Sequence, residues 1–147
     1  MKRIICACLA TAVLAALVTL TTTASAQNGC SVATLNGVYS WSQTGSEPKN
    51  NMGALLPFAT LALTTFDGAG NFSATYTDVS PGRPGGYSAP VRGTITGTYT
   101  VNSDCTGSMS SPSFGLTWDL VIIGGGTEVF GIATTPFIVA TSDFKKL

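Results

Sequence analysis

The stretch VRGTITGTYTV, residues Val91–Val101, alternates between two kinds of side chain and indicates a β-strand with two unlike faces. Its odd positions are apolar or small, whereas its even positions are one arginine followed by four threonines. Because successive side chains of a strand point to opposite sides of the sheet, the pattern predicts that Tyr99 faces inward and Thr98 faces solvent. Gly93 and Gly97 fall on the inner face, where they leave room for a bulky neighbour or for a sharp bend.

The chain beyond residue 26 carries the same period-two pattern, and no stretch of it shows helical periodicity. Further strands are predicted at 37–42, 59–66, 72–79, 108–111, 116–123, 128–134 and 137–141. About eight short antiparallel strands, joined mostly by tight glycine-rich turns, predict an all-β fold, either an up-and-down barrel or alternatively a β-sandwich. Three loops are expected, at 43–56, 80–90 and 111–115. An eight-stranded barrel encloses enough space for packed side chains or for one small ligand.

The N-terminus has the order of a secretory signal peptide. A Lys-Arg pair at 2–3 is followed by an apolar run at 4–20, and the sequence ASA at 24–26 fits the A-x-A cleavage pattern. We therefore expect residues 1–26 to be removed and residues 27–147 to form one domain, secreted or periplasmic in a bacterium. A membrane anchor is the rival interpretation, but the apolar run is short for a span and the cleavage motif follows it closely.

Cleavage would leave two of the four cysteines, Cys30 and Cys105, in the mature chain. The oxidising environment outside the cytoplasm favours a disulfide between them. A metal pair or a reactive thiol is the alternative, but the chain contains no histidine, and no metal site is predicted. Closing a loop of about 75 residues would stabilise the fold by about 4 kcal/mol.

The charge of the mature chain is close to balanced. The whole chain has seven basic and seven acidic side chains, and loss of the pair at 2–3 leaves a net charge of −2. No stretch is rich in lysine or arginine, so nucleic acid is not an expected partner. The threonine face of Val91–Val101 disfavours a membrane-spanning barrel, whose lipid-facing positions must be apolar. No membrane span is therefore expected after signal cleavage.

Three short patterns carry a family resemblance: LNGxY at 35–39, FDGxGN at 66–71 and GTYTVNxDCTG at 97–107. With them the chain resembles a group of small secreted bacterial β-barrel proteins, over nearly the whole mature region. The layout is more distantly similar to the barrels of allene oxide cyclase and dirigent proteins. The resemblance implies export and a barrel, and it carries no catalytic residue over to this chain.

The absence of histidine excludes the common Ser-His-Asp and Cys-His catalytic arrangements, and neither a catalytic residue nor a cofactor is predicted. Carboxylates stay as candidates, because a buried Asp or Glu can act as an acid or a base. Asp78 and Glu128 share the parity of neighbouring aromatic residues and are expected to point inward near a strand end. Asp119 is expected on the outside. Asp67 and Asp104 are predicted to form turns by accepting hydrogen bonds from backbone N–H groups.

Aromatic residues give the clearest prediction of a site. Six of them are expected to face one interior: Tyr39, Trp41, Tyr76, Tyr99, Trp118 and Phe130. Such rings form either a solid core or, where the interior is not full, an apolar pocket with phenol and indole donors. The resulting hypothesis is a protein that binds a small apolar molecule or acts as an exported structural or interaction module. The alternative is a cofactor-free cyclase or isomerase that holds its substrate in the barrel cavity.

Overall fold

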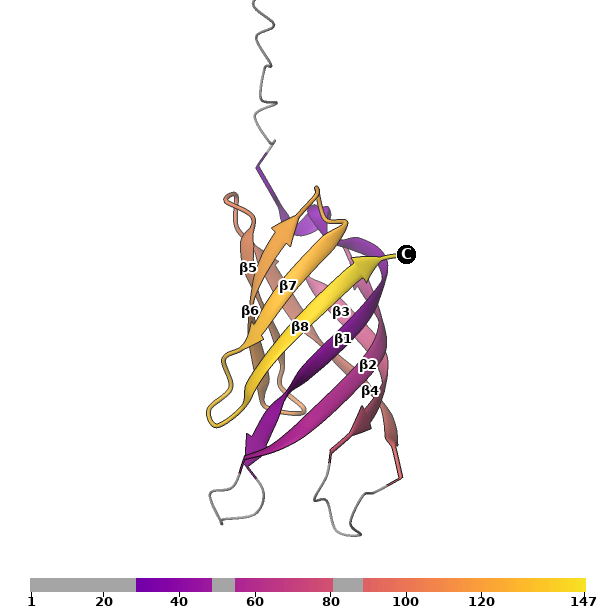
Figure 1. Cartoon of the computed structure of the whole chain (residues 1–147). Helices are drawn as coiled ribbons and strands as arrows, with labels where there is room; N and C mark the ends of the chain where they lie inside the picture. Colours follow the sequence, from indigo (N-terminus) through magenta and orange to yellow (C-terminus); the bar gives the residue numbers. More distant parts are fainter. Residues whose placement is uncertain (1–28, 49–54, 81–88) are drawn as a thin grey trace, which may run out of the picture.

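The computed structural model describes residues 29–48, 55–80 and 89–147, and the expected signal peptide at 1–26 lies outside this part. The described residues form a short 3-10 helix and eight strands, which follow one another around a closed barrel (Figure 1). The elements are η1 (Val32–Thr34), β1 (Asn36–Pro48), β2 (Leu55–Asp67), β3 (Asn71–Val79), β4 (Val91–Val101), β5 (Thr106–Ser111), β6 (Leu116–Ile123), β7 (Glu128–Ala133) and β8 (Val139–Lys146). In the described part of the chain, no helix is long and apolar enough to cross a membrane.

Each strand pairs antiparallel with the next one, and β8 returns to pair with β1. The closing register runs from Tyr39 opposite Lys146 to Ser46 opposite Val139. The predicted up-and-down barrel is therefore confirmed, and the alternative of a sandwich is wrong. Because the sheet closes on itself, each described strand has a paired neighbour on both of its sides.

Strand β4 has the predicted bounds and the predicted orientation. Tyr99 is 3% exposed, whereas Thr98 lies on the solvent side. A Cβ added to Gly93 would lie 2.8 Å from the hydroxyl oxygen of Tyr76, so this glycine makes room for a ring from β3. Small residues on the inner face of β4 thus leave space into which large side chains of the neighbouring strand pack.

Strands β1 and β2 are longer than predicted, and β8 is displaced. Residues 43–48 continue β1, and Leu55 already begins β2, so most of the loop expected at 43–56 is strand. Residues 43–48 are polar or small on both faces, and their sequence therefore lacks the alternation by which a strand is recognised. The backbone ladder with β2 and β8 forms all the same, because it needs only N–H and C=O groups.

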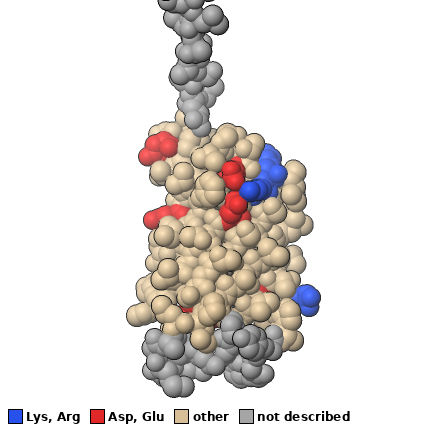
Figure 2. Space-filling view, viewed as in Figure 1, with Lys and Arg blue, Asp and Glu red and all other residues tan. Residues whose placement is uncertain are grey.

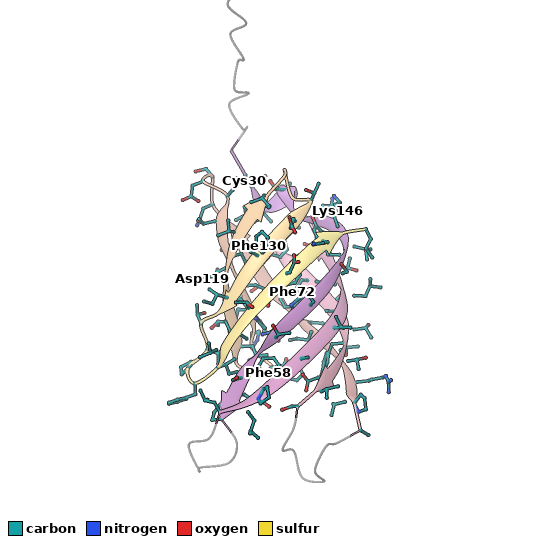
Figure 3. The ribbon with its side chains drawn as sticks, viewed as in Figure 1. Cys30, Phe58, Phe72, Asp119, Phe130 and Lys146 are labelled. Atoms are coloured by element: carbon teal, nitrogen blue, oxygen red, sulfur yellow. A yellow bond between two sulfur atoms is a disulfide. The ribbon has the colours of Figure 1, made fainter. Side chains whose placement is uncertain are left out.

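Strand β7 faces the opposite way from the prediction. Val129 is fully buried, whereas Phe130 is 46% exposed on the outer wall (Figure 3). The expectation that Phe130 and Glu128 point inward is wrong. Both faces of this short strand carry apolar residues, so alternation alone does not decide between them. The register does, because Val129 lies opposite the buried Phe144 of β8.

The outer wall carries few charges between its two ends. On the face shown in Figure 2, most acidic and basic side chains gather toward the end at which the C-terminus lies. Near this end Lys145 of β8 lies 3.4 Å from a carboxylate oxygen of Glu128 and 3.5 Å from one of Asp143. Asp119 is exposed, as expected from its parity.

Candidate functional site

The barrel has two unlike ends. We call the end that holds η1 and the two cysteines the disulfide end (Figure 1). The connections at 112–115 and 134–138 lie at the opposite end, which we call the pocket end. Which end is filled and which is hollow decides where a ligand fits.

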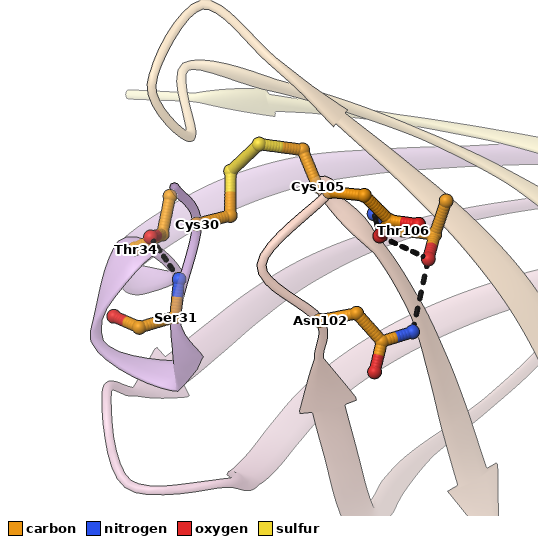
Figure 4. The surroundings of a disulfide bond; sticks show 7 residues. Cys30, Ser31, Thr34, Asn102, Cys105 and Thr106 are labelled. Atoms are coloured by element: carbon orange, nitrogen blue, oxygen red, sulfur yellow. Dashed lines mark hydrogen bonds between the residues drawn. A yellow bond between two sulfur atoms is a disulfide. The ribbon is translucent and has the colours of Figure 1, made fainter. Parts of the chain in front are cut away.

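A disulfide fastens the N-terminal segment to the barrel wall. Cys30 and Cys105 are bonded, with their Cα atoms 4.9 Å apart across 75 residues of sequence. The bond joins the segment before η1 to the β4–β5 turn (Figure 4). The backbone N–H of Cys30 also donates to the carbonyl of Ser103, at 3.3 Å. The predicted disulfide is therefore confirmed, and it holds η1 at this end.

The residues around η1 plug the disulfide end. Leu35 follows η1 and is fully buried. The hydroxyl of Tyr99 donates to the backbone carbonyls of Leu35, at 2.7 Å, and Val32, at 3.1 Å. The hydroxyl of Tyr39 donates to the carbonyl of Gly126, at 2.6 Å. Both phenols therefore serve to close this end.

Burial also sets the protonation of these two phenols. It raises the pKa of Tyr39 above its ordinary value, and the neighbouring Tyr99 raises it further. Burial likewise raises the pKa of Tyr99, against an opposing effect of backbone hydrogen bonds. The two hydroxyls therefore stay protonated at neutral pH and act as hydrogen-bond donors.

Phe66 lies at the centre of a packed aromatic cluster next to this plug. Its ring lies edge to face with Tyr39 and Tyr99, with centroid distances of 5.2 and 5.0 Å. The rings of Phe72 and Phe144 also pack against Phe66, with centroid distances of 6.2 and 5.9 Å. All five rings are at most 3% exposed. This half of the barrel is a solid core.

The other half contains a pocket of about 110 Å³. A wholly apolar cavity of about 150 Å³ takes up benzene, whereas sites for drug-sized ligands span about 300–1,000 Å³. The pocket is therefore suited to a molecule built on a single ring or a short chain. Among the described residues, five aromatic rings line it: Trp41, Phe58, Tyr76, Phe114 and Trp118.

These rings come from both the interior and the mouth. Trp41 and Trp118 are 4% and 1% exposed and meet edge to face. Phe114, in the β5–β6 turn, is 49% exposed and meets Tyr76 edge to face with centroids 6.2 Å apart. Phe58 lies at the pocket end, close to the end of the barrel (Figure 3). A bound molecule would thus contact rings from the inner end of the pocket to its mouth.

Among the described lining residues, the carboxylate, amide and hydroxyl side chains lie on one side of the pocket. Gln43 of β1 is opposite Thr60 of β2, which is opposite Asp78 of β3, so three adjacent strands each supply one polar side chain. The Thr60 hydroxyl donates to a carboxylate oxygen of Asp78, at 2.7 Å. Farther along β1, Glu47 accepts a hydrogen bond from the Ser80 hydroxyl, at 2.6 Å. We call these four lining residues the β1–β3 wall, namely Gln43, Glu47, Thr60 and Asp78.

The facing side is apolar. It is built by residues of β4, β6 and β7 and of the β7–β8 connection: Ile95, Leu116, Ala133 and Ile138. We call these residues the β4–β7 wall. The pocket therefore has the two-sided character of a site for an amphipathic molecule, with apolar contact on one side and hydrogen-bonding groups on the other.

Two buried donors in the pocket lining are unused. Among the described residues, the indole Nε1–H groups of Trp41 and Trp118 have no hydrogen-bond acceptor. Buried N–H groups are nearly always paired, and leaving one unpaired costs about 1–3 kcal/mol. Neither nitrogen atom has accessible surface, so these two donors belong to the packed interior behind the pocket.

The structure brings together three of the six aromatic residues predicted for the site. Trp41, Tyr76 and Trp118 line the pocket. Tyr39 and Tyr99 belong to the packed half, and Phe130 lies outside the barrel. The predicted site therefore divides between a core, a pocket and the outer wall.

Sequence reasoning missed most of the polar wall. Asp78 was expected to point inward, and it is 9% exposed inside the barrel. The sequence pattern predicts a loop at Gln43 and Glu47, although both continue the inward parity of Trp41 along β1. That shared parity is the signal by which they could have been found. In the described part of the chain, no group of three or more His, Cys, Asp or Glu residues is placed to hold a metal ion.

A second hollow lies on the outer surface over β1 and its neighbours, with a volume of about 430 Å³. Most of its lining residues face outward, including the exposed Ser40, Leu61 and Lys145. It is a groove between surface side chains, whereas the pocket between Trp41 and Trp118 is enclosed by the barrel. The interior pocket is therefore the better candidate site.

No family model, curated protein or solved structure matches the chain.

Proposed function

We propose that the protein is an exported barrel that binds a small, largely apolar molecule in the pocket between Trp41, Tyr76 and Trp118. The observation that carries the proposal is the contrast between the two halves of the barrel. One half is packed with contacting rings, whereas the other holds a pocket of about 110 Å³ whose lining rings extend to the mouth. Ring-lined hollows with a few polar groups on one side are the usual composition of small-ligand sites.

Export forms part of the proposal. The N-terminal pattern supports it, and the disulfide between Cys30 and Cys105 is compatible with an oxidising compartment. Sequencing of the protein recovered from the periplasm or medium should therefore begin at Gln27. Recovery of only the full-length chain, in the membrane fraction, would contradict export with cleavage.

Ligand binding is tested with small single-ring compounds such as toluene, benzyl alcohol and benzylamine. A compound that binds only the folded protein raises the melting temperature by mass action, and it should also change the tryptophan fluorescence. We expect both responses to saturate together for at least one of the three compounds.

A matched pair of variants locates the response. Ala133→Leu adds bulk on the β4–β7 wall and should abolish the response, because the added side chain occupies the pocket. Ile132→Leu, one residue earlier on the exposed face, should leave it unchanged. Equal responses from both variants would show that the compounds bind elsewhere.

A further inference from the structure

Gln43 differs from the other members of the β1–β3 wall in its hydrogen bonding. The Thr60 hydroxyl donates to Asp78, and the Ser80 hydroxyl donates to Glu47. In contrast, no described residue donates a hydrogen bond to the Gln43 amide or accepts one from it. The wall therefore contains one amide that the described part of the barrel does not engage.

The two cross-strand neighbours of Gln43 leave its amide without a partner. Gln43 of β1 lies opposite Thr60 of β2 and opposite Ser142 of β8. The Thr60 hydroxyl is directed to Asp78 instead. The Ser142 hydroxyl is sealed from solvent and has no hydrogen-bond partner among the described residues. Neither neighbouring side chain therefore satisfies the amide.

The Gln43 side chain is nevertheless buried, and it lines the pocket. It is 7% exposed and points inward with the parity of Trp41. Unlike the indole nitrogens of Trp41 and Trp118, its amide oxygen and nitrogen keep some accessible surface. Buried polar groups are nearly always hydrogen-bonded, because leaving one unpaired is costly. A molecule that fills the pocket displaces the water next to this amide, and it binds well only if it supplies hydrogen bonds of its own.

The chemistry of the amide specifies its complement. A carboxamide has one carbonyl acceptor and two N–H donors. One of these N–H groups points to the same side as the carbonyl, so a donor and an acceptor lie next to each other on one edge. A second amide pairs with this edge through two parallel hydrogen bonds when its own N–H and C=O share a side. Lactams and primary carboxamides meet this condition, whereas open-chain secondary amides are almost always trans and do not.

We infer that the ligand carries a lactam or a primary carboxamide, which pairs with the Gln43 side chain while the apolar body of the ligand packs against the β4–β7 wall. This inference rests on the proposed function, since it names the chemical class of molecule that the same pocket takes. The observation that carries it is a buried amide without a partner in the lining of a pocket whose facing side is apolar.

The test compares two six-membered rings, δ-valerolactam and cyclohexanone. They share the ring size and the carbonyl, and they differ in an N–H in place of a CH₂ group. Cyclohexanone can accept from the Gln43 N–H, but it leaves the Gln43 carbonyl unpaired. Dissociation constants are measured by calorimetric titration of the mature, disulfide-bonded protein. δ-Valerolactam should bind at least about fivefold more tightly, because a site that pairs with an N–H group discriminates against the analogue that lacks it.

A matched pair of variants assigns the preference to Gln43. Gln43→Met keeps an unbranched side chain of similar length and removes the amide. It should weaken δ-valerolactam binding by about fivefold or more and leave cyclohexanone binding nearly unchanged. Thr44→Val, at the next position of β1, changes an exposed polar side chain into an apolar one of similar shape, and it should leave the preference intact.

Two further measurements separate a binding role from a structural one. Gln43→Met should not lower the melting temperature of the unliganded protein, because no hydrogen bond to a described residue is lost. If this variant does not fold, ¹H–¹⁵N spectra of the unmodified protein still decide the question. The side-chain NH₂ signals of Gln43 should move on titration with δ-valerolactam, with the dissociation constant found by calorimetry, and unchanged signals at saturation would overturn the inference.

The outcomes distinguish this inference from the proposed function. Equal or tighter binding of cyclohexanone would overturn the inference and leave the proposed function standing. So would a preference for δ-valerolactam that survives Gln43→Met, or failure of both rings to bind while toluene or benzyl alcohol does. Failure of every one of these compounds to bind would overturn the proposed function, and the inference with it.

Discussion

The indole rings of Trp41 and Trp118 meet edge to face inside the barrel, with centroids 5.8 Å apart and planes at 85°. The ring of Phe144 stacks on Trp41, with centroids 5.2 Å apart and planes at 13°. Phe144 in turn contacts the packed aromatic cluster through Phe66. Trp41 therefore forms the boundary between the filled half of the barrel and the pocket, and a molecule bound there would contact a ring that the core already holds in place.

Replacement of a ring at the mouth should affect binding more than stability. Phe114 is 49% exposed, so Phe114→Ala should change the free energy of unfolding by less than about 1 kcal/mol. The same change removes a ring from the pocket lining and should weaken the binding of a single-ring compound several-fold. Phe130→Ala is the control, because Phe130 is 46% exposed but lies on the outer wall. Denaturant unfolding and fluorescence titration measure the two effects, and equal losses of affinity would contradict the assignment of Phe114 to the pocket.

Adjacent residues of β4 should differ sharply in their contribution to stability. Tyr99→Ala should destabilise the protein by about 3 kcal/mol or more, because it removes a buried ring. Tyr99→Phe should cost about 1–3 kcal/mol, since it leaves the carbonyl of Leu35 buried without its donor. Thr98→Ala should stay within about 0.5 kcal/mol. Chemical denaturation gives all three values, and similar losses for Tyr99→Ala and Thr98→Ala would contradict the described register.

Stability should fall at alkaline pH because of two phenols. Burial raises the pKa of Tyr39 and Tyr99 in the folded protein above the ordinary value of about 10. The unfolded chain therefore loses these protons first. Their stabilising contribution is complete below about pH 10 and is lost as the pH rises through the folded-state pKa values. Denaturation midpoints measured at increasing pH should fall less steeply for Tyr39→Phe than for the unmodified protein, and parallel curves would argue against this origin.

The disulfide should account for a large share of the stability. A bond that closes 75 residues constrains the unfolded chain and contributes about 4 kcal/mol, against about 5–15 kcal/mol for a typical domain. Reduction, or replacement of Cys30 and Cys105 together by serine, should lower the free energy of unfolding by about this amount. Mass spectrometry of the native protein should find no free thiol. Reaction of both cysteines with a blocking agent before reduction would show that the bond does not form.

The sequence predicts the fold well where the two faces of a strand differ in chemistry. In β4 the threonines face water and the apolar residues face inward, so bounds and orientation agree with the structure. Strand β6 behaves in the same way, with Trp118 and Leu120 buried and Asp119 exposed. In β7 both faces are apolar, and the orientation of Phe130 depends on pairing with β6 and β8, which no local pattern encodes.

The site is less predictable than the fold, because it depends on which strands become neighbours. The sequence predicts that aromatic rings fill the interior. Nothing in it, however, distinguishes Tyr39, which closes one end, from Trp41, which lines the pocket two residues later. Their roles differ because η1 covers only the disulfide end. The polar wall arises from the register that places Gln43, Thr60 and Asp78 on adjacent strands, and register is a property of the closed sheet.

The two tryptophans allow the most direct test of the pocket as a binding site. The chain contains only Trp41 and Trp118, so a ¹H–¹⁵N correlation spectrum of the mature protein should show two indole N–H signals, both from pocket residues. Titration with benzylamine, benzyl alcohol and toluene should move both signals along saturable curves for at least one compound, with one dissociation constant for the pair. The account is contradicted if neither indole signal moves at saturating concentrations of any of the three, or if the shifts map only to outward-facing residues.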